Sequence, residues 1–370
     1  MRYYIIAGEA SGDLHGSNLM KALYKEDPAA DIRFWGGDLM QNVGGTLVKH
    51  YRELAFMGFA EVAMNLKTIL NNIKFCKADI EKFNPDVIIF IDYPGFNMRI
   101  AKWAKQKGIK THYYIAPQIW AWKENRIKAV KSDFDKLFVI LPFEKDFFEV
   151  KHNFPVEFVG HPLIDAIHNR PKTGETAFRK ENNLDQRPII AILPGSRKQE
   201  ISKMLSVMLS IVSDFPDYQF VIAGAPSQEY HFYEQFLNTK NVKFVSNKTY
   251  DLLSIATAAL VTSGTATLET ALFKVPEVVC YKGSWASYQI AKRIITLKYI
   301  SLVNLIMDEE VVTELIQDKF NPKNLKKELT KLLDDNYRKN LLEKYEALEL
   351  KLGGIGASEK TAKLILNDLR

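Results

Sequence analysis

One pattern recurs along the whole sequence: a short, continuously apolar run, then a turn of small or polar residues, then a segment of helical length. Apolar runs without polar alternation are typical of strands buried on both faces of a parallel sheet, and their alternation with helices predicts βαβ units. The candidate strands are Tyr3–Ala7, Val87–Ile91, Thr111–Ile115, Lys136–Leu141, Pro188–Leu193, Tyr218–Gly224 and Ala258–Thr262. We therefore predict an α/β protein with two Rossmann-like, doubly wound parallel-sheet domains that face each other across a cleft.

A polar segment marks the boundary between the two predicted domains. His168–Gln186 contains a proline and a glycine and lacks a strong strand pattern. We predict an N-terminal domain of residues 1–165 and a C-terminal domain of residues 166–345. We expect the C-terminal helix, about residues 346–370, to pack back on the N-terminal domain.

Composition narrows the class of protein. The chain of 370 residues is 47% hydrophobic and 25% charged, which is typical of a globular protein with room for two cores. Cys76 and Cys280 lie far apart without metal-ligand spacing, which argues against structural zinc and suits a reducing compartment. The first apolar run ends too early for a signal peptide, and no run is long enough to span a bilayer, so we expect a cytoplasmic protein.

The charge of the chain leaves its partners open. A formal net charge of +6 fits a nucleic-acid surface, an anionic membrane surface or a phosphorylated substrate equally well. Taken by itself, the net charge is best explained by an ordinary solvated surface.

The turn after the first predicted strand is a candidate substrate site. Its candidate contacts are Gly8, Glu9, Ser11, Gly12 and His15. Glycines let the backbone approach a ligand closely, and the next helix offers its N-terminal N–H groups. The spacing is not that of the GxGxxG fingerprint, so a dinucleotide site is poorly supported. The alternative is a tight structural turn with Ser11 or Asp13 as the helix N-cap, which explains the glycines but not Glu9 or His15.

Asp92 follows the predicted buried strand Val87–Ile91 directly. A carboxylate at the C-terminal end of such a strand points into the crevice where a general base would stand. The alternative is that Asp92 caps the helix that begins near Asn97. The residue alone does not separate the two interpretations.

Two turns in the second half fit a nucleotide diphosphate-sugar. Their candidate contacts are Gly195, Ser196 and Arg197 in one turn, and Ser263, Gly264, Thr265 and Glu269 in the other. Arginine suits a multi-donor grip on a diphosphate, the small residues open a helix whose dipole favours an anion, and Glu269 can accept hydrogen bonds from ribose hydroxyls. The sequence has no GxxxxGK[ST], no metal-holding DxD pair and no HExxH. We therefore expect no metal and no cofactor.

The segment Leu54–Phe75 has an apolar stripe of helical period, which is usually plain core. Phe56, Met57 and Met64 fall partly outside this stripe. This surplus predicts a surface for acyl chains or a membrane, and we assign Met57 to a substrate contact.

Across essentially its whole length, the sequence resembles the lipid-A-disaccharide synthase family, inverting glycosyltransferases of family 19 with a GT-B fold. The resemblance rests on Ala7–Gly16, Leu54–Gly58, Pro85–Asn97, Gly108–Thr111, Pro117–Trp122, Leu141–Lys145, Gly160–Pro162, Leu193–Arg197, Ser263–Glu269 and Ser301–Leu305. It implies a lipid-acceptor role for the N-terminal domain and a UDP-sugar role for the C-terminal domain. It also implies peripheral attachment to the cytoplasmic face of the inner membrane and no nucleic acid, and it leaves a homo-oligomer open.

The resemblance implies one reaction. UDP-2,3-diacylglucosamine and 2,3-diacylglucosamine 1-phosphate would give the β-1,6-linked disaccharide 1-phosphate and UDP, in lipid A and lipopolysaccharide biosynthesis. Asp92 takes the place of the family's candidate base, Arg197 and Asn304 match its important polar residues, and Glu9 matches another acidic position. We therefore count these four as catalytic candidates, with Asp92 as the proposed base and Glu9 as the alternative that the sequence leaves open.

Two positions depart from the family pattern. Gly95 stands where many relatives carry a second aspartate, and Val303 where many carry a proline. If the second carboxylate transferred the proton, this chain would lack it.

Two other functions remain as alternatives. One is a GT-B-type sugar-nucleotide 2-epimerase, which would need no lipid surface. The other is a non-catalytic nucleotide-sugar or lipid binder, which would release no UDP.

Overall fold

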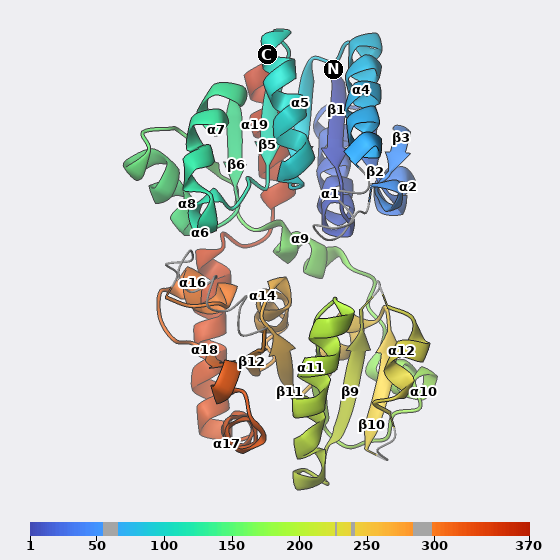
Figure 1. The fold of residues 1–370 in the computed structure, drawn as a ribbon, viewed down its shortest axis with the longest axis vertical. Helices are drawn as coiled ribbons and strands as arrows, with labels where there is room; N and C mark the ends of the chain where they lie inside the picture. The colour runs from blue at the N-terminus through green and yellow to red at the C-terminus, as the bar shows by residue number, and fades with distance from the viewer. Residues whose placement is uncertain (55–65, 226–227, 238–240, 284–297) are drawn as a thin grey trace. The chain divides into compact units, whose positions relative to one another are not determined.

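The computed structural model describes residues 1–54, 66–225, 228–237, 241–283 and 298–370. It divides into two compact units, each with its own parallel sheet (Figure 1). Unit 1 comprises Met1–Asn169 and Leu352–Arg370, and unit 2 comprises Arg170–Lys351. Met57, and with it residues 55–65 of the apolar stripe, lies outside the described residues.

The described part of unit 1 contains a seven-stranded sheet in the order β3-β2-β1-β4-β5-β6-β7, with parallel pairing throughout. The strands are β1 (Arg2–Ala7), β2 (Asp31–Gly36), β3 (Thr46–His50), β4 (Val87–Ile91), β5 (Lys110–Tyr114), β6 (Lys136–Val139) and β7 (Glu157–Phe158). Every residue of β4 is buried, as expected for a strand covered by helices on both faces.

Helices cover both faces of this sheet (Figure 1). They are α1 (Ala10–Glu26), α2 (Asp38–Val43), α4 (Leu66–Phe83), α5 (Pro94–Gln106), α6 (Ile119–Trp122), α7 (Ile127–Asp133), α8 (Pro142–Asp146), α9 (Pro162–Asn169) and α19 (Ala357–Leu369). The core on the α4 and α5 face includes Cys76, Phe90, Ile100 and Tyr113. The free thiol of Cys76 is part of this apolar packing.

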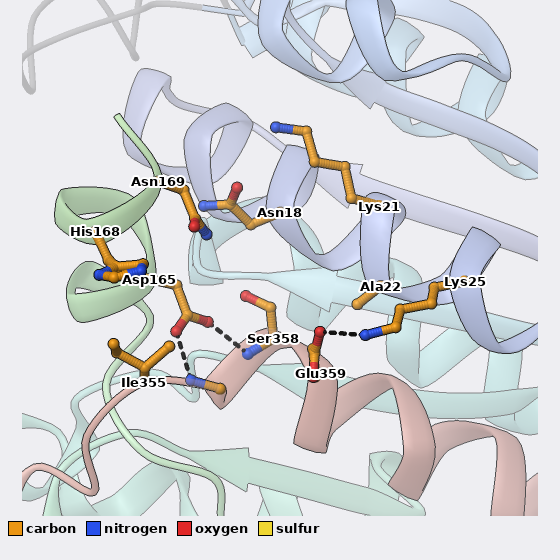
Figure 2. A pocket seen from close by; sticks show the side chains of 11 residues that line it. Asn18, Lys21, Ala22, Lys25, Asp165, His168, Asn169, Ile355, Ser358 and Glu359 are labelled. Atoms are coloured by element: carbon orange, nitrogen blue, oxygen red, sulfur yellow. Dashed lines mark hydrogen bonds and ion pairs between the residues drawn. The ribbon is translucent and has the colours of Figure 1, made fainter. Parts of the chain in front are cut away.

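The last helix, α19, returns to unit 1 and packs against α1 (Figure 1). The buried carboxylate of Asp165 in α9 accepts hydrogen bonds from the backbone N–H groups of Gly356 and Ser358 at the start of α19 (Figure 2). At the other end, His112 Nε2 lies 3.0 Å from the carboxylate of Asp368. These contacts fix α19 on unit 1 at both ends.

Unit 2 repeats the architecture, with a six-stranded parallel sheet in the order β10-β9-β8-β11-β12-β13 among its described residues. The strands are β8 (Ile189–Leu193), β9 (Gln219–Gly224), β10 (Val242–Ser246), β11 (Ala258–Thr262), β12 (Glu277–Tyr281) and β13 (Thr313–Ile316). The helices are α10 (Glu175–Glu181), α11 (Lys198–Met208), α12 (Tyr230–Glu234), α13 (Thr249–Leu253), α14 (Thr265–Leu272), α16 (Leu302–Met307), α17 (Pro322–Leu332) and α18 (Asp335–Lys351).

Two glycines of the first motif lie in a helix and not in the turn where they were expected. Helix α1 begins at Ala10, so Gly12 and Gly16 lie inside it rather than in a loop. A Cβ on Gly12 would lie 3.1 Å from the Cβ of Ala7, and one on Gly16 would lie 2.7 Å from the sulfur of Met40. Both glycines therefore allow α1 to pack closely on its neighbours.

Candidate active site

The turns after β1 and β4 meet at the C-terminal edge of the unit 1 sheet. The ring of Tyr93 lies so close to Gly8 that a Cβ there would be 2.3 Å from ring atoms. The same ring stacks on Phe96 at 5.6 Å. Gly8 is therefore needed for the close approach of these two turns. This approach brings the carboxylates of Glu9 and Asp92 near enough for their charges to interact.

Backbone strain is concentrated at this edge. Asp92 (φ 44°), Tyr93 (φ 50°) and Ile115 (φ 61°) all adopt the left-handed conformation, although none is a glycine. This conformation costs an L-residue roughly 1–2 kcal/mol and is especially unusual for a β-branched side chain. Such strain persists where the surrounding structure enforces it, and it is frequent at functional sites.

The two carboxyl groups at this edge, Glu9 and Asp92, have raised pKa values. Burial raises the pKa of Asp92 above its ordinary value, partly offset by the N–H of Tyr93. Partial burial and the charge of Asp92 raise the pKa of Glu9. Burial and the charge of Glu9 also raise the pKa of Tyr93. A carboxylate with a raised pKa is a stronger proton acceptor, which suits general base catalysis.

The expected capping roles differ from those in the structure. Glu9 is the N-cap residue of α1, and its side chain makes no capping hydrogen bond. Neither Ser11 nor Asp13 caps α1. Asp13 instead accepts backbone N–H bonds from Gly37, Leu39 and Met40 at 2.7–3.0 Å and so stabilises the start of α2. Tyr93, and not Asp92, is the N-cap residue of α5, again without a side-chain cap.

His15 lies half-buried in the second turn of α1. Burial lowers its pKa to about 4, and burial together with His15 lowers the pKa of the buried His161 to about 3. His161 Nδ1 accepts a hydrogen bond from the N–H of Leu163. In the sequence, His161 stands out only as part of the Gly160–Pro162 family motif. Its electrostatic coupling to His15 became visible only once the fold placed the two rings together.

In unit 2, the turn after β8 presents an exposed arginine at a helix N-terminus. Arg197 is the N-cap residue of α11, and both it and Ser196 are exposed. Gly195 has φ +98°, and a Cβ there would lie 2.6 Å from the carboxylate of Glu200. The turn therefore requires glycine, and the N-terminus of the 11-residue helix α11 favours an anion next to Arg197.

The turn after β11 opens α14. Gly264 and Thr265 are exposed there, and the hydroxyl of Ser263 donates to the carbonyl of Ile300 at 2.9 Å. Glu269 lies one turn further on and accepts a hydrogen bond from the Tyr250 hydroxyl at 2.9 Å. Burial raises the pKa of Glu269. The hydrogen bond from Tyr250 fixes the position of the Glu269 carboxylate. The sequence did not predict this contact.

Asn304 is completely buried and its amide is fully occupied by protein groups. Its oxygen accepts from the N–H groups of Val311 and Val312 at 2.8 and 2.9 Å. Its nitrogen donates to the carbonyl of Val312 at 2.8 Å and to Glu314 at 3.0 Å. Since a side-chain amide has two donors and one acceptor oxygen, these contacts support a positioning role for Asn304 rather than contact with substrate.

The described residues include no group of three or more His, Cys, Asp or Glu side chains placed to hold a metal ion. Within the same part of the chain, no helix is both long and apolar enough to cross a bilayer.

Solved structures of sugar-nucleotide enzymes share this fold. A UDP-GlcNAc 2-epimerase from Neisseria meningitidis bound to UDP-GlcNAc aligns with a TM-score of 0.70 at 14% identity, covering 100% of this chain and 99% of that one. A Staphylococcus aureus MnaA–UDP structure aligns with a TM-score of 0.71 at 13% identity, covering 100% and 97%. At such low identity the likeness concerns the fold alone, and it confirms the predicted class of two parallel-sheet α/β domains of the GT-B type.

Sequence comparison identifies the family. The family model described as lipid-A-disaccharide synthetase matches residues 3–365. A lipid-A-disaccharide synthase of Coxiella burnetii is 38% identical over 98% of this chain and 97% of its own. One of Geobacter sulfurreducens is 36% identical over 100% and 97%. The chain therefore belongs to the lipid-A-disaccharide synthetase family of glycosyltransferases.

Proposed function

We propose that the protein joins UDP-2,3-diacylglucosamine to 2,3-diacylglucosamine 1-phosphate, giving the β-1,6-linked disaccharide 1-phosphate and UDP with inversion at the anomeric carbon. The observation that carries this proposal is Asp92, a strained, half-buried carboxylate of raised pKa at the end of a central strand. It matches the family's candidate base in a chain that matches the family model from residue 3 to residue 365.

In the proposed mechanism, Asp92 accepts the proton of the acceptor 6-hydroxyl as its oxygen attacks the anomeric carbon. The new C–O bond forms on the face opposite UDP, and the bond to the diphosphate breaks with its electron pair leaving on UDP. Base catalysis of this kind contributes about 10²–10⁴-fold to the rate. Glu9, whose charge interacts with that of Asp92, is the alternative base.

Unit 2 is proposed to hold the donor. Arg197 and the N-termini of α11 and α14 would stabilise the charge that grows on the departing diphosphate. Glu269, anchored by Tyr250, would accept from the ribose hydroxyls. We expect this positive charge to suffice without a metal ion, so turnover should persist in EDTA.

Unit 1 is proposed to bind the lipid-linked acceptor at the cytoplasmic face of the inner membrane. Leu70 and Phe75 on α4 are about half exposed, which is consistent with an apolar surface beside the segment that contains Met57. Flotation with anionic liposomes tests this attachment. A protein that stays at the bottom of the gradient while remaining active in dilute detergent would contradict it.

The decisive experiment measures UDP release from UDP-2,3-diacylglucosamine, with and without 2,3-diacylglucosamine 1-phosphate, in EDTA and mild detergent. We expect release that depends on the acceptor. UDP binding without release would refute the transferase assignment. Because the epimerases share the fold, the same preparation should be assayed with UDP-GlcNAc without detergent, where epimerisation would establish the rival activity.

A further inference from the structure

Two buried side chains, one on β5 and one on α5, hold the backbone carbonyl of Asp92. The Tyr113 hydroxyl on β5 donates to the carbonyl oxygen of Asp92 at 2.7 Å. The Asn97 amide on α5 donates to the same oxygen at 2.7 Å. A carbonyl oxygen has two lone pairs, so this one is fully occupied. Both donors are completely buried, and water therefore does not compete for these bonds.

The two donors are themselves immobilised. The ring of Tyr113 lies 6.0 Å from Phe90 and 4.8 Å from Phe134, between ring centroids. Because Tyr113 stands opposite Phe90 in the parallel register, its hydroxyl reaches just past the end of β4. The N–H of Asn97 donates to the carbonyl of Tyr93 at 3.1 Å, which ties the first turn of α5 to the same strained turn.

We propose that Tyr113 and Asn97 are positioning residues for the base: their hydrogen bonds to the Asp92 carbonyl enforce the left-handed backbone that aims the Asp92 carboxylate. This inference rests on the proposed function of Asp92. Two consecutive left-handed non-glycine residues relax when the contacts that enforce them are removed. Rotation about the N–Cα bond of Asp92 toward negative φ would then turn the carboxylate away from the acceptor hydroxyl.

The test compares two tyrosines that are neighbours on one strand. Tyr113→Phe removes the hydroxyl that holds Asp92. Tyr114→Phe removes an equally buried hydroxyl that faces Ser358 and Thr361 of α19 and does not hold Asp92. Acceptor-dependent UDP release should fall roughly 10- to 100-fold in kcat for Tyr113→Phe, with the donor KM nearly unchanged, since a small misplacement of a catalytic group has effects of this size. Tyr114→Phe should stay within about twofold of the parent enzyme.

A double-mutant cycle separates positioning from a general structural defect. If Tyr113 acts through Asp92, Tyr113→Phe should have no further effect on the residual turnover of Asp92→Ala. A further loss of the same factor in that background, or full activity of Tyr113→Phe alone, would overturn the proposal. Full activity of Asp92→Ala would instead refute the assignment of Asp92 as the base. This outcome can be told apart from the two outcomes that overturn the positioning role, because in both of those Asp92→Ala remains slow.

Two additional measurements keep the test decisive. Asn97→Ala, which removes the other donor, is assayed in parallel in case Tyr113→Phe does not fold. If the residual turnover of Asp92→Ala is too slow for the double-mutant cycle, the pH dependence of kcat for Tyr113→Phe decides, through the limb on its acid side. Release of the Asp92 carboxylate toward water should move this limb to lower pH in Tyr113→Phe, whereas an unmoved limb would contradict positioning.

Discussion

The carboxylate of Asp165 accepts a hydrogen bond from the backbone N–H of Gly356 at 2.7 Å, although 191 positions separate the two residues in the sequence. A second bond, from the N–H of Ser358 at 2.9 Å, completes the cap of α19. Unit 1 therefore depends on a helix that the chain adds after it has completed unit 2.

We expect Asp165→Ala to destabilise the docking of α19 by about 1–2 kcal/mol, because the partly buried N–H of Gly356 and the buried N–H of Ser358 lose their acceptor. Hydrogen exchange of the first turn of α19 should become correspondingly faster. Lys25→Met is the matched control, since it breaks only the exposed ion pair with Glu359 on the same helix. Equal exchange rates in the Asp165 variant and the parent would contradict the capping role.

We predict that Asp92→Ala lowers kcat for UDP release by about 10²–10⁴-fold, the range of general base catalysis, while UDP affinity stays nearly unchanged. The substitution preserves the Asp92 carbonyl, so the backbone contacts remain available. Calorimetric titration with UDP and a turnover assay on the same preparation check both statements. Loss of UDP binding would assign Asp92 to donor binding or to structure.

Arg197 and Asn304 should give opposite results when truncated. Arg197→Ala removes an exposed cation, and we expect UDP affinity to fall about tenfold or more without a change in thermal stability.

Asn304→Ala leaves the N–H groups of Val311 and Val312 without their acceptor, and we expect a loss of about 2 kcal/mol or more in the stability of unit 2. Unchanged thermal unfolding of Asn304→Ala would show that its role is not structural.

His112 should make the stability of unit 1 pH-dependent. Burial lowers its pKa to about 4, although Asp368 and Asp135 oppose this shift. Its stability contribution is complete above its ordinary value of 6.5 and is lost as pH falls toward 4, because the unfolded chain then binds a proton that the folded chain does not. At about 1.4 kcal/mol per pKa unit, the loss reaches roughly 3 kcal/mol.

Urea unfolding between pH 4 and 7 tests this effect. His112→Gln should flatten the dependence, although His15 and His161 act in the same direction and will leave part of it. His168→Gln, at an exposed position, should follow the parent curve. Identical slopes for His112→Gln and the parent would refute the assignment.

The periodicity of the sequence was sufficient to predict the fold class. Strands buried on both faces must be continuously apolar, so β1, β4, β8 and β11 can be recognised locally, and polar residues at their ends predict where a site lies. The prediction of Gly195 in a tight turn next to Arg197 also holds, because its positive φ is a local requirement.

Tertiary structure decided what the individual polar residues do. The family resemblance makes Asn304 a catalytic candidate, and the fold adds that Val311, Val312 and Glu314 occupy its amide. Gly12 looked like part of a ligand loop, but it lies in a helix packed on Ala7. A buried polar group must be paired, and its partner can come from any element that the fold brings close. Sequence patterns therefore determine which strands and turns form, whereas the hydrogen bonds that hold Asp92 in place depend on β5 and α5 meeting at the end of β4.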